Sequence, residues 1–72
     1  EDYEGALKTV ENMRQVDMNE YRLLLDAGVL YARTNRVEAA IAALEDYITK
    51  APREYDRHDA AVLLQELKDY VP

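Results

Sequence analysis

The side chains that could do chemistry in this 72-residue sequence are one histidine and several close groups of carboxylates. Cysteine and serine are absent, which removes thiolate metal ligands, thiol redox chemistry and two common nucleophiles. His58 is a lone histidine between Arg57 and Asp59, whereas a metal site needs several ligands at matched spacing. The carboxylate groups are Glu1, Asp2 and Glu4, then Glu45 and Asp46, then Asp56 and Asp59. Solvated helix faces and helix N-termini account for them, so we predict no catalytic residues, no metal and no cofactor.

Composition restricts the classes of partner. Fifteen acidic residues outnumber nine basic ones, giving a net charge of −6, so we predict no binding to nucleic acid. The longest runs without a charge, 27–32, 39–44 and 60–65, are too short to span a bilayer, so we predict no membrane partner. No signal peptide and no Met open the sequence, so we expect a cytoplasmic protein of which this is one piece.

An internal repeat is the strongest pattern in the sequence. Shifting the chain by 34 residues aligns 38 pairs, of which eight are identical. The identical pairs are Glu4/Glu38, Ala6/Ala40, Glu11/Glu45, Glu20/Glu54, Tyr21/Tyr55, Ala27/Ala61, Leu30/Leu64 and Val37/Val71. This period is typical of stacked helical hairpins.

Helical periodicity predicts four helices and no strands. They cover about 3–16, 20–34, 37–50 and a segment that starts near Asp56. Each predicted helix has an apolar stripe expected to face inward. In the first two helices the stripes are Tyr3, Ala6, Leu7, Val10 and Met13, and then Leu23, Leu24, Ala27, Leu30 and Tyr31. In the third helix the stripe aligned with the first is Val37, Ala40, Ile41, Leu44 and Tyr47, and in the fourth it is Ala60, Leu63, Leu64, Leu67 and Val71. The fold class predicted is therefore all-α.

The ends of these helices have local signals. Asp17 or Asn19 is expected to cap the second helix, and Asn35 to close it in the left-handed conformation. Pro52 ends the third helix, and Asp56 with Asp59 has the spacing of an N-terminal cap. Gly28 lies in the middle of a helix, where it indicates close approach by a neighbouring helix.

The 34-residue period resembles that of the tetratricopeptide family. Leu24, Ala27, Gly28 and Tyr31 resemble positions of that family's first helix, and Ala40, Leu44 and Pro52 resemble positions of its second. The resemblance implies a single domain in which 1–20 is the second helix of a partial repeat, 21–54 a complete repeat and 55–72 a C-terminal capping helix. Departures are Leu24 for tryptophan, Tyr47 for alanine, Met18 for proline, and Asn35-Arg36 for Gly-Asp.

Residues 26–52 also resemble the C-terminal repeats of bacterial transglutaminase-like proteins. The catalytic Cys and His of that family would lie upstream, and no residue of this sequence matches them. The family resemblance implies a protein–protein interaction scaffold. The alternative is a structural C-terminal appendage that stabilises an upstream transglutaminase-like enzyme domain.

The tetratricopeptide resemblance also points to a candidate binding face. Arg22, Leu25, Val29 and Arg33 share one face of the second helix, which in that family lines a concave peptide groove. On the fourth helix the corresponding residues are Asp59, Leu63 and Glu66. Leu25 and Val29 stand where that family's carboxylate clamp has Lys and Asn, so a C-terminal carboxylate is not the expected ligand.

The N-terminal end of the stack is a second candidate surface, either for an upstream part of the same chain or for a second copy. Without a preceding helix, Tyr3, Val16 and one edge of Leu7 are expected to stay partly uncovered. We therefore expect self-association through the first helix, with a homo-oligomer as one outcome.

Overall fold

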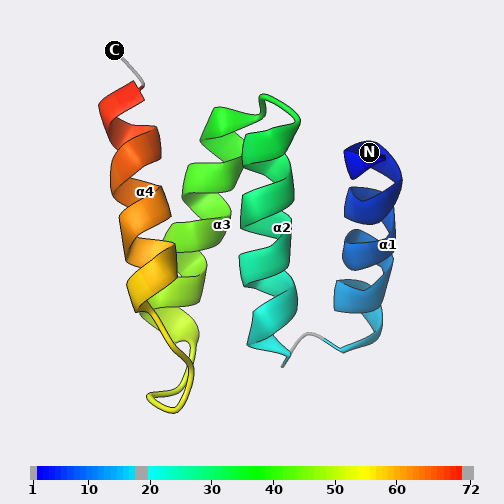
Figure 1. Cartoon of the computed structure of the whole chain (residues 1–72). Helices are drawn as coiled ribbons and strands as arrows, with labels where there is room; N and C mark the ends of the chain where they lie inside the picture. The colour runs from blue at the N-terminus through cyan, green and yellow to red at the C-terminus, as the bar shows by residue number, and fades with distance from the viewer. Residues whose placement is uncertain (1, 18–19, 71–72) are drawn as a thin grey trace.

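The computed structural model is a row of four antiparallel helices, and it describes residues 2–17 and 20–70. The helices are α1 (Tyr3–Val16), α2 (Tyr21–Arg33), α3 (Val37–Lys50) and α4 (His58–Tyr70). Each packs on the next one in sequence, and α3 is set behind the plane of α2 and α4 in Figure 1. No strand occurs in the described ranges, and the predicted all-α helix stack is confirmed.

The α2–α3 turn ends α2 as its sequence predicts. Asn35 has a φ of 63°, the left-handed conformation that asparagine tolerates. The Arg36 N–H donates to the Tyr31 carbonyl at 2.8 Å and the Asn35 N–H to the Ala32 carbonyl at 3.3 Å. These two bonds form a Schellman motif, which satisfies carbonyls that the helix end leaves open.

The predicted cap of the second helix differs from the structure, whereas Asp56 binds a backbone N–H at the start of the fourth helix as its predicted role requires. Asp17 closes α1, its N–H donating to the Met13 carbonyl at 3.0 Å, and α2 is instead capped by Glu20, whose carboxylate accepts from the Arg22 N–H at 3.2 Å. Asn19 lies outside the described residues. Helix α4 begins at His58 because the Asp56 carboxylate accepts the His58 N–H at 2.8 Å from just before the helix.

The core lies between α2 and α3 and reaches α4. Ala27, Ala40, Leu44 and Ala60 are fully buried, and Tyr47 is 2 % exposed. In α4, Leu63, Leu64 and Leu67 are half-buried, and Val71 lies outside the described residues. Apolar burial of this kind supplies about 1.5–3 kcal/mol for each large side chain.

Helix α1 is the least buried of the four. Leu7 is its one buried residue among those described, whereas Met13 is 49 % exposed and Ala6 is exposed. The predicted inward stripe is therefore wrong at both of these positions. The physical reason is that α1 packs mainly on α2, so its stripe is covered only along the line of that contact.

Gly28 allows α2 and α3 to approach closely. A Cβ at position 28 would lie 2.8 Å from Leu44 Cδ2 and 2.9 Å from Leu44 Cγ, and Leu44 has no exposed surface into which to move. The predicted close approach is confirmed. The contact outweighs the cost of about 1 kcal/mol that glycine carries in a helix.

We predict that Gly28→Leu lowers the free energy of unfolding by about 1–3 kcal/mol, because overpacking exceeds the gain in helix propensity. Urea denaturation measures it. Ala42→Leu, at an exposed position of α3, is the matched control and should change stability by at most about 0.5 kcal/mol. A higher denaturation midpoint for Gly28→Leu would contradict the close packing.

Candidate functional site

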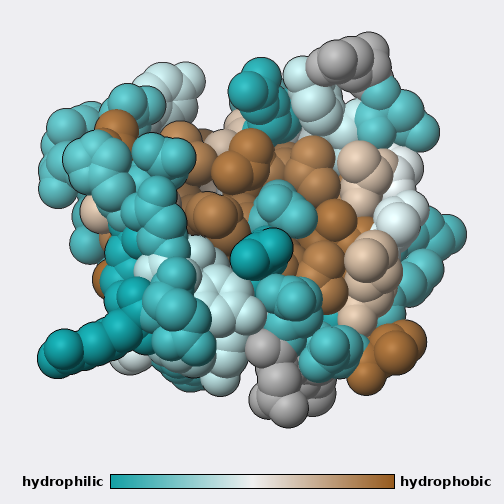
Figure 2. Space-filling model, turned by 60° about the horizontal axis from the view of Figure 1, so that its bottom comes forward, coloured by the Kyte–Doolittle hydropathy of each residue, from teal (hydrophilic) through white to brown (hydrophobic). Residues whose placement is uncertain are grey.

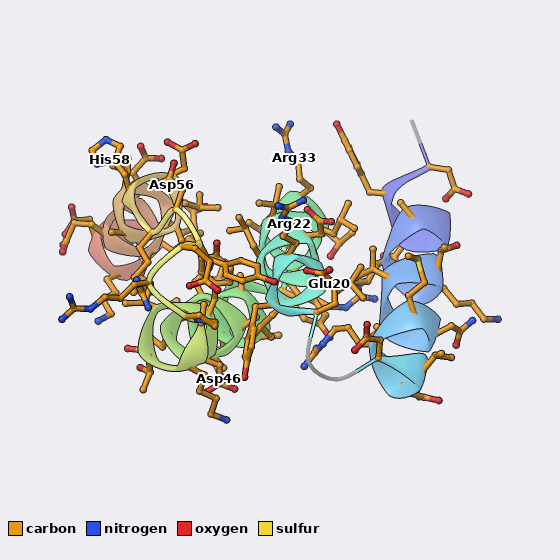
Figure 3. The ribbon with its side chains drawn as sticks, turned by 90° about the horizontal axis from the view of Figure 1, so that it is seen from below. Glu20, Arg22, Arg33, Asp46, Asp56 and His58 are labelled. Carbon is orange, nitrogen blue, oxygen red and sulfur yellow. The ribbon has the colours of Figure 1, made fainter. Side chains whose placement is uncertain are left out.

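The predicted binding face of α2 lies on the open side of the helix row. In Figure 3, Arg22, Arg33, Asp56 and His58 lie toward one side of the molecule and Asp46 lies toward the other. Figure 2 shows an apolar area in the middle of the molecule with hydrophilic surface on both sides. Leu25 and Val29 are half-buried, so α2 offers part of its apolar surface to a partner.

A depression of about 470 Å³ lies at the start of this face, and we call it the docking depression. Its lining comes from α2, α3, the α3–α4 loop and the first turn of α4. The lining residues are Arg22, Leu25, Tyr47, Glu54, Tyr55, Asp56 and Asp59. The structure thus brings three of the predicted residues, Arg22, Leu25 and Asp59, into one site.

Tyrosine rings form one wall of the docking depression. The Tyr55 ring lies edge-on to Tyr21 at 5.8 Å and to Tyr47 at 6.4 Å, between ring centroids. The Arg22 guanidinium lies over the Tyr55 ring, 5.9 Å from its centroid. Such contacts add about 0.5–1.5 kcal/mol each to the packing. Tyr55 is therefore fixed between the core and the open surface.

Polar contacts fix the same wall. The Tyr47 hydroxyl donates to the Asp56 carbonyl at 2.8 Å, and the Tyr55 hydroxyl donates to Glu20 Oε1 at 3.4 Å. Burial and the neighbouring Glu20 carboxylate raise the pKa of Tyr55. The α3–α4 loop is thereby held to both α2 and α3.

Sequence reasoning did not select Tyr47, Glu54, Tyr55 or Asp56 for the site. Tyr47 was predicted in the core, and Asp56 as a cap, and both contribute to the depression as well. The repeat is the sequence pattern that could have drawn attention to two of these residues, because Glu54 and Tyr55 are identical to Glu20 and Tyr21 one period earlier.

The remaining predicted groove residues do not line the depression. Val29 and Leu63 are half-buried, whereas Arg33 and Glu66 are exposed. The Arg33 guanidinium lies over the Tyr3 ring of α1, 5.6 Å from its centroid. Arg33 follows Arg22 by eleven residues, about 16 Å along the helix, so the predicted stripe joins two separate places.

The predicted self-association surface is only partly as expected. Val16 is 88 % exposed, as predicted, but Leu7 is 4 % exposed, so the expectation of an uncovered edge there is wrong. Leu7 is the buried residue of α1 among those described, and α1 packs on α2. Tyr3 is half-buried and contacts Arg33. Self-association itself stays a prediction.

A second depression, of about 580 Å³, lies between α1 and α2. Tyr31 and Glu11, from its two sides, are joined by a hydrogen bond of 2.8 Å that the tyrosine hydroxyl donates. This bond to a carboxylate, together with burial and the negative charge of Glu11, raises the pKa of Tyr31. A second link, the ion pair between Arg36 and Glu4 at 3.0 Å, also ties α1 to the rest.

The described residues hold no group of three or more His, Asp or Glu side chains placed to bind a metal ion. His58 is exposed at the start of α4. In the same ranges no helix is both long enough and apolar enough to cross a bilayer.

Comparison with known proteins gives one result. A family model described as tetratricopeptide repeat matches residues 1–68. Searches of curated proteins and of solved structures gave no match. The match confirms the tetratricopeptide resemblance, whereas the narrower resemblance to transglutaminase-like proteins has no support from it.

The hydrogen bond between Tyr31 and Glu11 makes stability depend on alkaline pH. Because the folded-state pKa of Tyr31 lies above the unfolded value of about 10, its contribution is complete below pH 10 and is lost as pH rises through the folded pKa. We predict that Tyr31→Phe is less stable than the parent by about 0.5–1 kcal/mol at pH 7 and that the difference shrinks above pH 10.

Urea denaturation at pH 7 to 11 measures that difference. Tyr70→Phe is the control, since Tyr70 is 79 % exposed and the change removes the same hydroxyl. A Tyr31→Phe deficit that stays constant to pH 11 would show that the hydrogen bond does not matter for folding.

Proposed function

Because the chain belongs to the tetratricopeptide repeat family, we propose that it is a non-catalytic protein–protein interaction module that docks a peptide segment on the open face of α2 and α4. In this proposal 21–54 is the complete repeat, 1–20 is part of the preceding one, and 55–72 is the capping helix. The partner is a protein or peptide in the cytoplasm.

The docking depression is the observation that carries the proposal. Its lining combines half-buried Leu25 and Tyr55 with the exposed residues Arg22, Glu54, Asp56 and Asp59. Tyrosine and arginine around an apolar centre are typical of binding hot spots in protein interfaces. Val29 and Leu63, both half-buried, extend the apolar surface beyond the depression along α2 and α4.

The alternative function is support of an upstream transglutaminase-like domain. The observation that favours it is apolar exposure on α1, where Met13 is 49 % and Val16 88 % exposed. An upstream segment or a second copy could cover these side chains. The two functions use different surfaces of the chain, so one set of variants separates them.

We expect peptides selected from a random display library against this chain to bind at the docking depression. Leu25→Gln should weaken the selected peptides by about tenfold or more, and Arg22→Glu should change their affinity in the direction that the charge of each peptide sets, since both residues line the site. Fluorescence anisotropy with labelled peptides measures the dissociation constants. Arg22 is exposed, so its variant tests the site even where Leu25→Gln reduces stability.

Ala42→Gln on α3 is the control for a polar change away from the depression, and Val16→Gln tests α1. Selected peptides that bind the Arg22 and Leu25 variants normally but lose affinity for Val16→Gln would place binding on α1 and overturn the proposal.

A further inference from the structure

The charges around the docking depression are unequal. Its lining includes three carboxylates, from Glu54, Asp56 and Asp59, and one guanidinium, from Arg22, which leaves an excess of two negative charges. All three carboxylate residues are exposed at the rim, while Leu25 and Tyr55 below them are half-buried. A partner group that fits this arrangement has an apolar stem and a positive end.

Two of the lining carboxylates, those of Glu54 and Asp59, differ from the third in their contacts with the described residues. Neither the Glu54 nor the Asp59 carboxylate forms a hydrogen bond or ion pair with any residue in the described ranges. Asp56 differs, because its Oδ1 accepts the His58 N–H at 2.8 Å. Glu54 and Asp59 are therefore available to a partner without breaking an internal contact.

The two cations of the α3–α4 loop, Arg53 and Arg57, do not line the depression. Arg57 donates from Nε to the Ile48 carbonyl at 3.0 Å and from Nη2 to the Ala51 carbonyl, so its charge lies against the C-terminal end of α3. Arg22 lies over the Tyr55 ring, where the ring faces α2. The negative excess at the opening is thus maintained by the fold.

We infer that the docking depression binds a lysine or arginine side chain from an otherwise apolar peptide segment. The aliphatic stem lies along Leu25 and the Tyr55 ring, and the charged end lies between Glu54 and Asp59. Neighbouring apolar side chains of the segment lie on Val29 and Leu63. The inference rests on the proposed function, and it names the chemistry of the partner.

The net charge of the whole chain also favours a basic partner. A net charge of −6 attracts basic segments and repels acidic ones at a distance, which raises the rate of association and suppresses acidic partners. Binding should therefore weaken as salt screens the rim charges.

Three acetylated and amidated six-residue peptides test the inference. Each has leucine at positions two and five, and the other four positions are all lysine, all glutamate or all glutamine. Two-dimensional NMR titration of the labelled chain measures affinity and location together. We expect the lysine peptide to bind at least about tenfold more tightly than the glutamate peptide, with shifts at Leu25, Tyr55 and Asp59.

Reversing the charge at Glu54 and Asp59 tests whether these two carboxylates bind the basic side chain. In the double variant Glu54→Lys with Asp59→Lys, the preference for the lysine peptide over the glutamate peptide should disappear or invert. Asp46→Lys is the control for a reversed charge, because Asp46 points to the opposite side of the molecule and only pairs with Lys50 at 3.8 Å. The control should keep the preference of the parent chain.

The outcomes separate the inference from the function it rests on. Equal binding of all three peptides at Leu25 and Val29 would overturn the basic partner and leave peptide docking intact. Tighter binding of the glutamate peptide would likewise overturn the inference. If all three shift only residues of α1, or none of them binds, the docking face itself is wrong, and both proposals fail.

Discussion

The contact of Gly28 with Leu44 is the constraint on which the rest of the structure depends. It brings α2 and α3 together closely enough that Leu44 and Ala40 lose all exposure, and it forms the centre of a structure with a Cα extent of only 17 Å in its thin direction. A molecule this thin has few residues that neighbours cover on every side. Most of its helices therefore keep one face open, which is a cost for stability and an opportunity for binding.

The position of the candidate binding face depends on the packing of α2 against α3. With one side of α2 held against α3, Arg22 stays exposed and Leu25 stays half-buried at the edge of the core. Tyr47, at the end of α3, then holds the following loop through the Asp56 carbonyl, and the loop places Tyr55 against Tyr21. The site is built from four segments of the chain, but each is positioned by the same α2–α3 packing.

Much of the fold follows from local patterns in the sequence. The helices 3–16 and 37–50 are found at the predicted residues. Helical periodicity marks their extent, and Asn35 before the start of 37–50 and Pro52 after its end are local signals of its limits. Tertiary contacts decide the remainder. The burial of Leu7 depends on where α2 covers α1, and the start of α4 at His58 depends on how Asp56 is used before the helix.

Local sequence patterns also predicted part of the candidate site. Helical spacing placed Arg22 and Leu25 together, and repeat alignment added Asp59. The rings and carboxylates of the α3–α4 loop have no periodicity, and their position depends on the Tyr47 hydroxyl and on Arg57, which contact the loop or hold it to α3. Loops of this kind are fixed by hydrogen bonds between distant residues, which spacing along the sequence does not reveal.

The proposed ligand of the docking depression is a basic peptide segment, held on an apolar face beside exposed carboxylates. Nuclear Overhauser contacts between the lysine peptide and the labelled chain test it most directly. We expect contacts from the lysine side-chain methylenes to the ring protons of Tyr55 and the methyl groups of Leu25. Contacts confined to Met13, Val16 or the depression between α1 and α2 would contradict it.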